Sequence, residues 1–111
     1  MSARSQPWFV YLVRCSDGTL YTGIARDVAA RMAQHDAGRG ARYTRGRGPL
    51  TLCATKRCRD KSEALRLELS IKRLTREAKQ QLTAAGRLRA FARAVRARQT
   101  AREPLGRALS D

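Results

Sequence analysis

Five residues have the types and the order along the chain that hydrolysis of a phosphodiester bond requires. Tyr11 and Tyr21 lie ten residues apart, and a phenol can act as a general base. Arg31 and His35 follow four residues apart, and an arginine fork binds phosphate oxygens in a fixed geometry. Glu68 comes later and offers a carboxylate for a divalent ion. Together these residues suit a nuclease active site.

The charge of the chain identifies the kind of partner. Its 111 residues contain 24 Lys+Arg against 9 Asp+Glu, a formal net charge of +15. Such a surface concentrates phosphates, so nucleic acid is the expected partner. No membrane is expected, because no apolar run reaches the roughly 18 residues needed to span a bilayer. The N-terminus lacks the pattern of a signal peptide, which predicts a cytoplasmic protein. One compact domain, acting as a monomer, is expected.

The cysteines predict neither a zinc site nor a disulfide. Cys15, Cys53 and Cys58 include no close-spaced CxxC pair, and His35 is the single histidine. A structural zinc site needs four ligands at suitable spacing. The cysteines are therefore interpreted as reduced and partly buried.

Residues 8–15 and 19–24 are predicted to form a β-hairpin, because both segments are rich in aromatic and β-branched residues. The strand period is two, so the length of the loop decides whether Tyr11 and Tyr21 share a face. A two-residue turn would put them on opposite faces. A three-residue loop would pair Tyr11 with Gly23 and would leave space beside the Tyr11 ring.

The three-residue alternative, Ser16-Asp17-Gly18 with Gly18 in a left-handed conformation, is the prediction. It also pairs Val13 with Tyr21. Only this register puts both tyrosines on one side of the sheet.

The next predicted element is a helix over residues 28–37, capped by Asp27 and ended by Gly38. Arg31 and His35 are spaced i,i+4, so they are expected side by side along the edge of its core-facing side. A strand over residues 50–57 is predicted after a basic, glycine-rich loop. That loop and the helix at 61–74 supply the candidate nucleic-acid-binding residues. For each basic residue among them, the alternative is an ordinary solvated surface charge. The candidates are Arg39, Arg42, Tyr43, Arg45, Arg47, Lys72 and Arg73.

Glu68 breaks the apolar pattern of the helix that Asp60 is expected to cap. At about 100° per residue, Glu68 lies inside the arc formed by Ala64, Leu67 and Ile71. A carboxylate there needs a compensating cation. Lys72 at i+4 is one alternative, and a divalent metal ion on a polyanion-binding surface is the other.

The C-terminal part is predicted to be helical. A short helix is expected from Thr75 to about residue 85, and a basic amphipathic helix over residues 87–102, ended by Pro104. The predicted organisation is an N-terminal tail (1–6), a nuclease domain (7–86), and a basic C-terminal helix and tail (87–111).

Over about residues 7–82 the chain resembles the GIY-YIG endonuclease superfamily, and above all its small stand-alone bacterial members. Tyr11 matches the tyrosine of the first half-motif, and Tyr21-Thr22-Gly23 matches the second. Arg31, His35 and Glu68 match the family's helix arginine, its His/Tyr position and its metal-binding glutamate.

The resemblance implies an α+β fold, in which helices flank a three-stranded antiparallel sheet. It implies a DNA endonuclease, structure-selective or weakly sequence-specific, with a role in repair or recombination and with branched, flap or single-stranded DNA as substrates. Glu68 would hold one Mg²⁺ or Mn²⁺ and Arg31 would contact the phosphate. Tyr21 would be the base and Tyr11 its hydrogen-bonded partner, or the reverse, with His35 orienting a tyrosine.

Two departures from the family pattern leave alternatives open. Many members carry an asparagine after the glutamate helix, where this chain has Lys79, Gln80 and Gln81, and Ile24 replaces a frequent lysine. A non-catalytic nucleic-acid-binding module on the same fold is therefore one alternative. A basic RNA-associated protein, supported by charge alone, is another.

Overall fold

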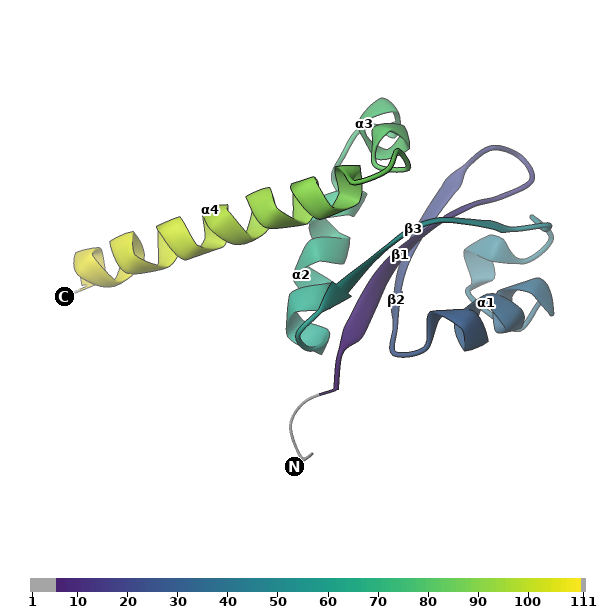
Figure 1. Ribbon diagram of the computed structural model, residues 1–111, viewed down its shortest axis with the longest axis horizontal. Coiled ribbons are helices and arrows are strands. Elements are labelled where there is room, and N and C mark those ends of the chain that lie inside the picture. The colour runs from purple at the N-terminus through teal and green to yellow at the C-terminus, as the bar shows by residue number, and fades with distance from the viewer. Residues whose placement is uncertain (1–5, 111) are drawn as a thin grey trace.

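A computed structural model describes residues 6–110, with side chains described for residues 6–99. It is an α+β fold with a three-stranded antiparallel sheet in the order β2-β1-β3, as predicted (Figure 1). The predicted tail at 1–6 lies outside the described residues except for Gln6. The elements in chain order are β1 (Trp8–Arg14), β2 (Leu20–Ala25), α1 (Val28–Asp36), the short 3₁₀ helix η1 (Arg42–Thr44), β3 (Thr51–Cys58), α2 (Lys61–Lys72), α3 (Arg76–Gln81) and α4 (Arg87–Ser110).

The β1–β2 hairpin has the predicted three-residue loop. The backbone N–H of Cys15 donates to the carbonyl of Thr19 at 2.8 Å, which closes the loop over residues 16–18. Gly18 has φ 86°, a left-handed conformation that favours glycine. Tyr11 is paired with Gly23, and Val13 with Tyr21. Both tyrosines therefore lie on one face of the sheet.

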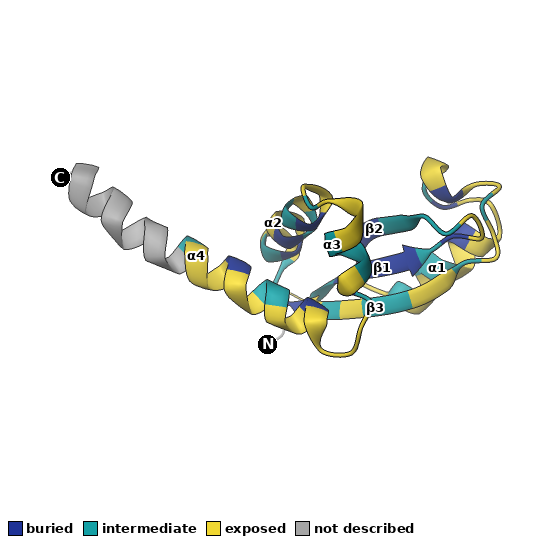
Figure 2. Cartoon of the chain, turned by 90° about the horizontal axis from the view of Figure 1, so that it is seen from above, coloured by how far each residue is buried: buried dark blue, intermediate teal, exposed yellow. Residues whose placement is uncertain are grey.

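The central strand β1 buries residues on both faces of the sheet. Val10 and Leu12 are fully buried beneath α2 and α4. Tyr11 and Val13, which alternate with them, lie on the opposite face. The face with α2 and α4 is called the back face here, and the face with Tyr11 and α1 is called the front face. Figure 2 shows β1 as the most buried strand between these layers.

Capping residues explain where the helices begin. Asp27 accepts a hydrogen bond from the backbone N–H of Ala30 at 3.0 Å, and α1 starts at the next residue. Asp60 accepts one from the N–H of Glu63 at 2.9 Å in the same way, at the start of α2. Gly38, with φ 78°, follows the end of α1, as the sequence predicted.

The predicted end of the C-terminal helix at Pro104 is wrong. Helix α4 continues to Ser110. A proline removes one backbone hydrogen bond from a helix, and here the helix passes through it. The first half of α4 packs on the back face through Leu88 and Val95, and its far end stands away from the sheet (Figure 1). In the described part of the chain, no helix is long and apolar enough to cross a membrane.

Candidate active site

Three aromatic side chains from three elements meet on the front face. The ring centroids of Tyr11 and Tyr21 are 6.3 Å apart, and His35 from α1 lies 5.9 Å from Tyr11 and 5.7 Å from Tyr21. Gly23 makes room for this arrangement, because a Cβ on it would lie 2.6 Å from Cζ of Tyr11. His35 is buried rather than at the edge of the helix face, where the sequence placed it.

The hydrogen bonds around His35 identify its tautomer. The backbone N–H of Ala41 donates to Nδ1 of His35 at 3.1 Å, so Nδ1 carries no proton. A neutral ring then carries its proton on Nε2, and this group donates to Oη of Tyr11 at 2.9 Å. The Tyr11 hydroxyl therefore accepts a hydrogen bond from His35 and can donate its own proton to another acceptor. The hydroxyl partner of Tyr11 is thus His35, and not Tyr21 as the sequence predicted.

Residues 40–44 hold the imidazole from its other side. Oγ1 of Thr44 lies 3.0 Å from Nδ1 of His35 and donates to the carbonyl of Ala41 at 2.8 Å. Thr44 is buried, with 1% of its surface exposed. Gly40 packs directly on the ring, because a Cβ there would lie 2.7 Å from Cγ of His35. Neither Thr44 nor Gly40 was predicted, since nothing in the sequence showed that the basic loop folds back onto the helix.

The environment shifts the pKa values of two site residues. Burial raises the pKa of Tyr11, the charges of Tyr21 and Glu68 add to this, and Arg31 opposes it. Burial lowers the pKa of His35 below its ordinary 6.5, Arg31 lowers it further, and Asp36 opposes the shift. Both shifts favour the neutral forms that the hydrogen bond between these two residues requires.

Tyr21 is held in place by a series of stacked contacts. Its ring stacks on Tyr43 with centroids 5.7 Å apart and an interplanar angle of 23°. The guanidinium of Arg47 lies over Tyr43 at 4.4 Å, and Asp17 in the hairpin loop forms an ion pair with Arg47. Tyr43, a candidate nucleic-acid-binding residue, thus stacks on Tyr21 within the chain and remains 41% exposed.

Glu68 approaches the site from α2. Its side chain is 16% exposed, and its charge contributes to the raised pKa of Tyr11. Nζ of Lys72 lies 3.3 Å from its carboxylate, so the structure contains the ion pair expected as one alternative. Within residues 6–99, no three His, Cys, Asp or Glu side chains are grouped to hold a metal ion. One carboxylate suits Mg²⁺ or Mn²⁺ that takes its other ligands from water and phosphate, so the donor set fits such an ion.

The remaining candidate residues lie around this centre with different exposures. Arg31 is half-buried and donates to Gln34 at 2.8 Å. Arg47 is half-buried, whereas the other arginines of the loop and the two basic residues of α2 are exposed: Arg39, Arg42, Arg45, Lys72 and Arg73.

Helix α3 contributes residues that the sequence did not predict as binding residues. Arg76, Lys79 and Gln80 line a pocket of about 250 Å³ together with Tyr43. Oε1 of Gln80 also accepts a hydrogen bond from Arg14 at 3.0 Å, which ties α3 to the sheet. Two basic residues thus lie beside the ring that stacks on Tyr21.

All three cysteines are free, with Cys15 and Cys58 buried and Cys53 partly buried. Their burial agrees with the predicted partly buried positions, and their reduced state stays a prediction. They take no part in the centre described above.

Known proteins share the region that contains these residues. The family described as "GIY-YIG catalytic domain" matches residues 7–81. A UPF0213 protein of Cronobacter sakazakii is 53% identical over 79 residues, which cover 71% of this chain and 83% of that protein. The UPF0213 protein YhbQ of Salmonella typhimurium is 50% identical over 76 residues, covering 68% of this chain and 76% of that protein. An E. faecalis protein solved by NMR is 32% identical with a TM-score of 0.50, covering 70% of this chain and 83% of that one. With its front-face tyrosines in the predicted register and the family match over most of its length, the chain belongs to the GIY-YIG family.

Proposed function

We propose that the protein is a metal-dependent DNA endonuclease, structure-selective or weakly sequence-specific, that hydrolyses phosphodiester bonds. The observation that carries this proposal is the meeting of Tyr11, Tyr21 and His35 on the front face, within electrostatic reach of Glu68. Residues that only stabilise a fold are not expected to bring a buried imidazole, two phenols and a carboxylate together.

Tyr21 is proposed as the general base. It is half-exposed, so a water molecule beside a bound phosphate can reach its hydroxyl, whereas Tyr11 is 1% exposed. Its ring is fixed by Tyr43 on one side and by the edge-on ring of His35. A tyrosine base needs positive charge nearby, and Arg31 is proposed to supply it, since its charge already opposes the raised pKa of the adjacent Tyr11.

Tyr11 and His35 are proposed to act as a pair. His35 donates its Nε2 proton to Oη of Tyr11 and thereby directs the Tyr11 hydroxyl proton toward the phosphate or its water. Because both members of the pair are neutral, the pair adds no charge to the site in the free protein.

Glu68 and Arg31 are proposed to position the phosphate. Glu68 would hold one Mg²⁺ or Mn²⁺, and a divalent ion at this place supplies Lewis acidity and stabilises the leaving oxygen. Arg31 would donate to the non-bridging oxygens. Lys72 neutralises Glu68 in the free protein.

The basic loop after α1 is proposed to hold the DNA backbone. Its exposed arginines, Arg39, Arg42 and Arg45, belong to the same loop as Tyr43 and add positive charge to that loop. The stacked rings and the basic loop suit single-stranded, flap or branched DNA, whose backbone bends toward the site at low cost. We place this activity in the cytoplasm, in DNA repair or recombination, with the protein acting as a monomer.

A non-catalytic nucleic-acid-binding module is the second candidate. Gln80 lies in the region where many family members carry asparagine, and it is engaged with Arg14 and with the carbonyl of Gly18. If this difference removes activity, the same surface still binds DNA.

A cleavage panel separates the two candidates. Flap, branched, single-stranded and duplex DNA are incubated with Mn²⁺ and with wild type, Glu68→Ala, or the control Glu77→Ala, which changes an exposed carboxylate on α3. The endonuclease proposal predicts cutting by wild type and Glu77→Ala, and loss in Glu68→Ala. No cutting above the Glu68→Ala level, with binding retained, supports the module instead. A preference for RNA over matched DNA supports an RNA-associated protein.

A further inference from the structure

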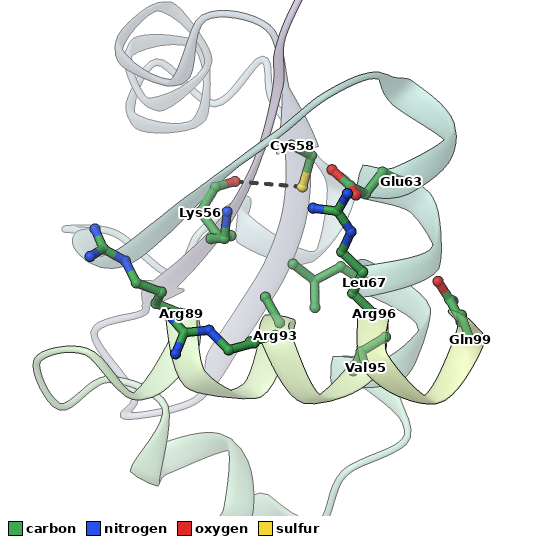
Figure 3. Close-up of a pocket in the computed structure, with 10 residues that line it drawn as sticks. Lys56, Cys58, Glu63, Leu67, Arg89, Arg93, Val95, Arg96 and Gln99 are labelled. Atoms are coloured by element: carbon green, nitrogen blue, oxygen red, sulfur yellow. Dashed lines mark hydrogen bonds between the residues drawn. The ribbon is translucent and has the colours of Figure 1, made fainter. Parts of the chain in front are cut away.

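A pocket of about 270 Å³ lies on the back face, between the first half of α4, strand β3 and helix α2 (Figure 3). Its floor is apolar, formed by Leu67 and Val95, and its walls are basic. Figure 3 shows Arg96 extending from α4 toward Cys58 and Glu63. The basic residues that line it are Lys56, Arg89, Arg93 and Arg96.

The pocket carries a net positive charge. Glu63 is the single carboxylate among the residues that line it. That carboxylate already accepts a hydrogen bond from the backbone N–H of Arg59 at 2.8 Å and lies 3.4 Å from its guanidinium. Among residues 6–99, no ion pair involves Arg89, Arg93 or Arg96. Four basic residues and one carboxylate therefore line the pocket, so its electrostatic potential favours an anionic ligand.

The pocket lies on the other side of the sheet from the three aromatic rings of the candidate active site. Leu12 and Val10 face the pocket side of the sheet, whereas Tyr11 faces the front. The sheet separates the pocket from these rings, while α2 borders both regions, with Leu67 in the pocket and Glu68 acting on Tyr11. Helix α4, which supplies three of the four cations, begins after the region matched by the family, so the family resemblance does not account for it.

We infer that the α4–β3 pocket binds the phosphate backbone of a second nucleic-acid segment, so that one molecule holds two segments on opposite faces. The inference rests on the proposed function in that it takes nucleic acid as the ligand. Arginine forks match phosphate geometry, and three of them line one side of a groove. A membrane surface is disfavoured, because none of the exposed large apolar residues lines the pocket: Tyr43, Leu52, Leu65 and Leu69.

A bridging assay tests the inference. Two duplexes, one labelled with a donor fluorophore and one with an acceptor, are mixed with the full chain without divalent metal, so that no cleavage occurs. Wild type is expected to bring the labels together. Arg93→Gln/Arg96→Gln is expected to reduce the bridging signal about tenfold. The affinity for DNA falls with salt, and the slope of log affinity against log salt should become shallower by about 2 in this variant. Each phosphate contact that is lost removes about 0.9 from the slope, and the variant lacks two arginines.

The matched control is Arg87→Gln/Arg98→Gln, which makes the same change on the same helix at exposed positions outside the pocket. It is expected to bridge like wild type. Absence of bridging by wild type, or equal bridging by the two double variants, overturns the inference. Binding to phosphatidylglycerol vesicles that is lost in the pocket variant, with DNA bridging unchanged, also overturns it. These outcomes are independent of the cleavage panel, which tests the endonuclease proposal separately.

Discussion

Nε2 of His35 donates its proton to Oη of Tyr11 at 2.9 Å, because the opposite nitrogen of the ring accepts the backbone N–H of Ala41. The hydrogen bond thus connects the β-hairpin to α1 and to the basic loop. It keeps both side chains neutral while fixing the direction of each proton. Residues that hold this pair in place should therefore affect cleavage even where they do not touch the substrate.

Thr44 is predicted to be a positioning residue for His35. Thr44→Val removes the hydroxyl that donates to the Ala41 carbonyl and contacts Nδ1, so the segment that presents the Ala41 N–H to Nδ1 is held less firmly and the imidazole loses its fixed orientation. We expect the cleavage rate to fall about tenfold and the free energy of unfolding to fall by about 1–2 kcal/mol. DNA affinity should change little. Thr44→Ser, which keeps the hydroxyl, should restore the rate. If Ser and Val are equally slow, the methyl group rather than the hydroxyl matters, and the positioning role is wrong.

Gly23→Ala is predicted to displace Tyr11. The added Cβ would lie 2.6 Å from Cζ of Tyr11 and 3.0 Å from Cε2 of Tyr21, so both rings must shift. Overpacking of this kind costs about 1–3 kcal/mol of stability. We expect cleavage to be lost while circular dichroism shows a folded protein. Gly48→Ala is the control, because its Cβ would meet nothing within 4 Å. Full activity in Gly23→Ala would show that Tyr11 has more freedom than the structure indicates.

Stability is predicted to decrease with acidification through the titration of His35. Its pKa is lowered in the fold, by burial first and then by Arg31, so the unfolded chain binds the proton more readily. The contribution is complete above pH 6.5 and is lost as the pH falls from there toward the lowered pKa. His35→Gln should remove the part of the pH dependence that sets in below about pH 6.5, because His35 is the single histidine. Chemical denaturation at several pH values measures the difference. Identical pH profiles for wild type and His35→Gln would contradict the shift.

Lys72→Gln is predicted to strengthen metal binding. Lys72 neutralises Glu68 in the free protein and so competes with a divalent ion for the carboxylate. An exposed ion pair contributes at most about 1 kcal/mol, so the Mn²⁺ concentration for half-maximal cleavage should fall by about two- to fivefold. Arg73→Gln, an equal change of charge at the neighbouring exposed position, should not lower it. A rise in the required Mn²⁺ in Lys72→Gln would mean that Lys72 assists the metal or the substrate.

Much of the fold could be predicted because its signals are local. The length of the loop at residues 16–18 determined which residues pair in the hairpin, and the pairing placed Tyr11 and Tyr21 on one face. Asp27 and Asp60 marked the starts of α1 and α2. The position of Glu68 on an otherwise apolar arc was visible in the helical period alone.

The parts that could not be predicted depend on contacts between distant segments. Thr44 reaches His35 because the basic loop folds back on α1, and no residue spacing shows this. Tyr43 was predicted only as a nucleic-acid contact, and its stacking on Tyr21 could not be read from the sequence. The continuation of α4 past Pro104 was missed because a proline was taken as a stop, whereas it removes only one backbone hydrogen bond.

The central claim is that Tyr21 takes a proton during hydrolysis at the front face, and single-turnover cleavage by Tyr21→Phe tests it most directly. The phenylalanine ring keeps the stack with Tyr43 and the contact with His35, so only the hydroxyl is lost. Tyr43→Phe is the matched control, since it removes a hydroxyl from the neighbouring ring of the same stack. The account predicts a cleavage rate reduced about a hundredfold or more in Tyr21→Phe, with DNA affinity unchanged and Tyr43→Phe near wild type. Cleavage by Tyr21→Phe at the wild-type rate would contradict it.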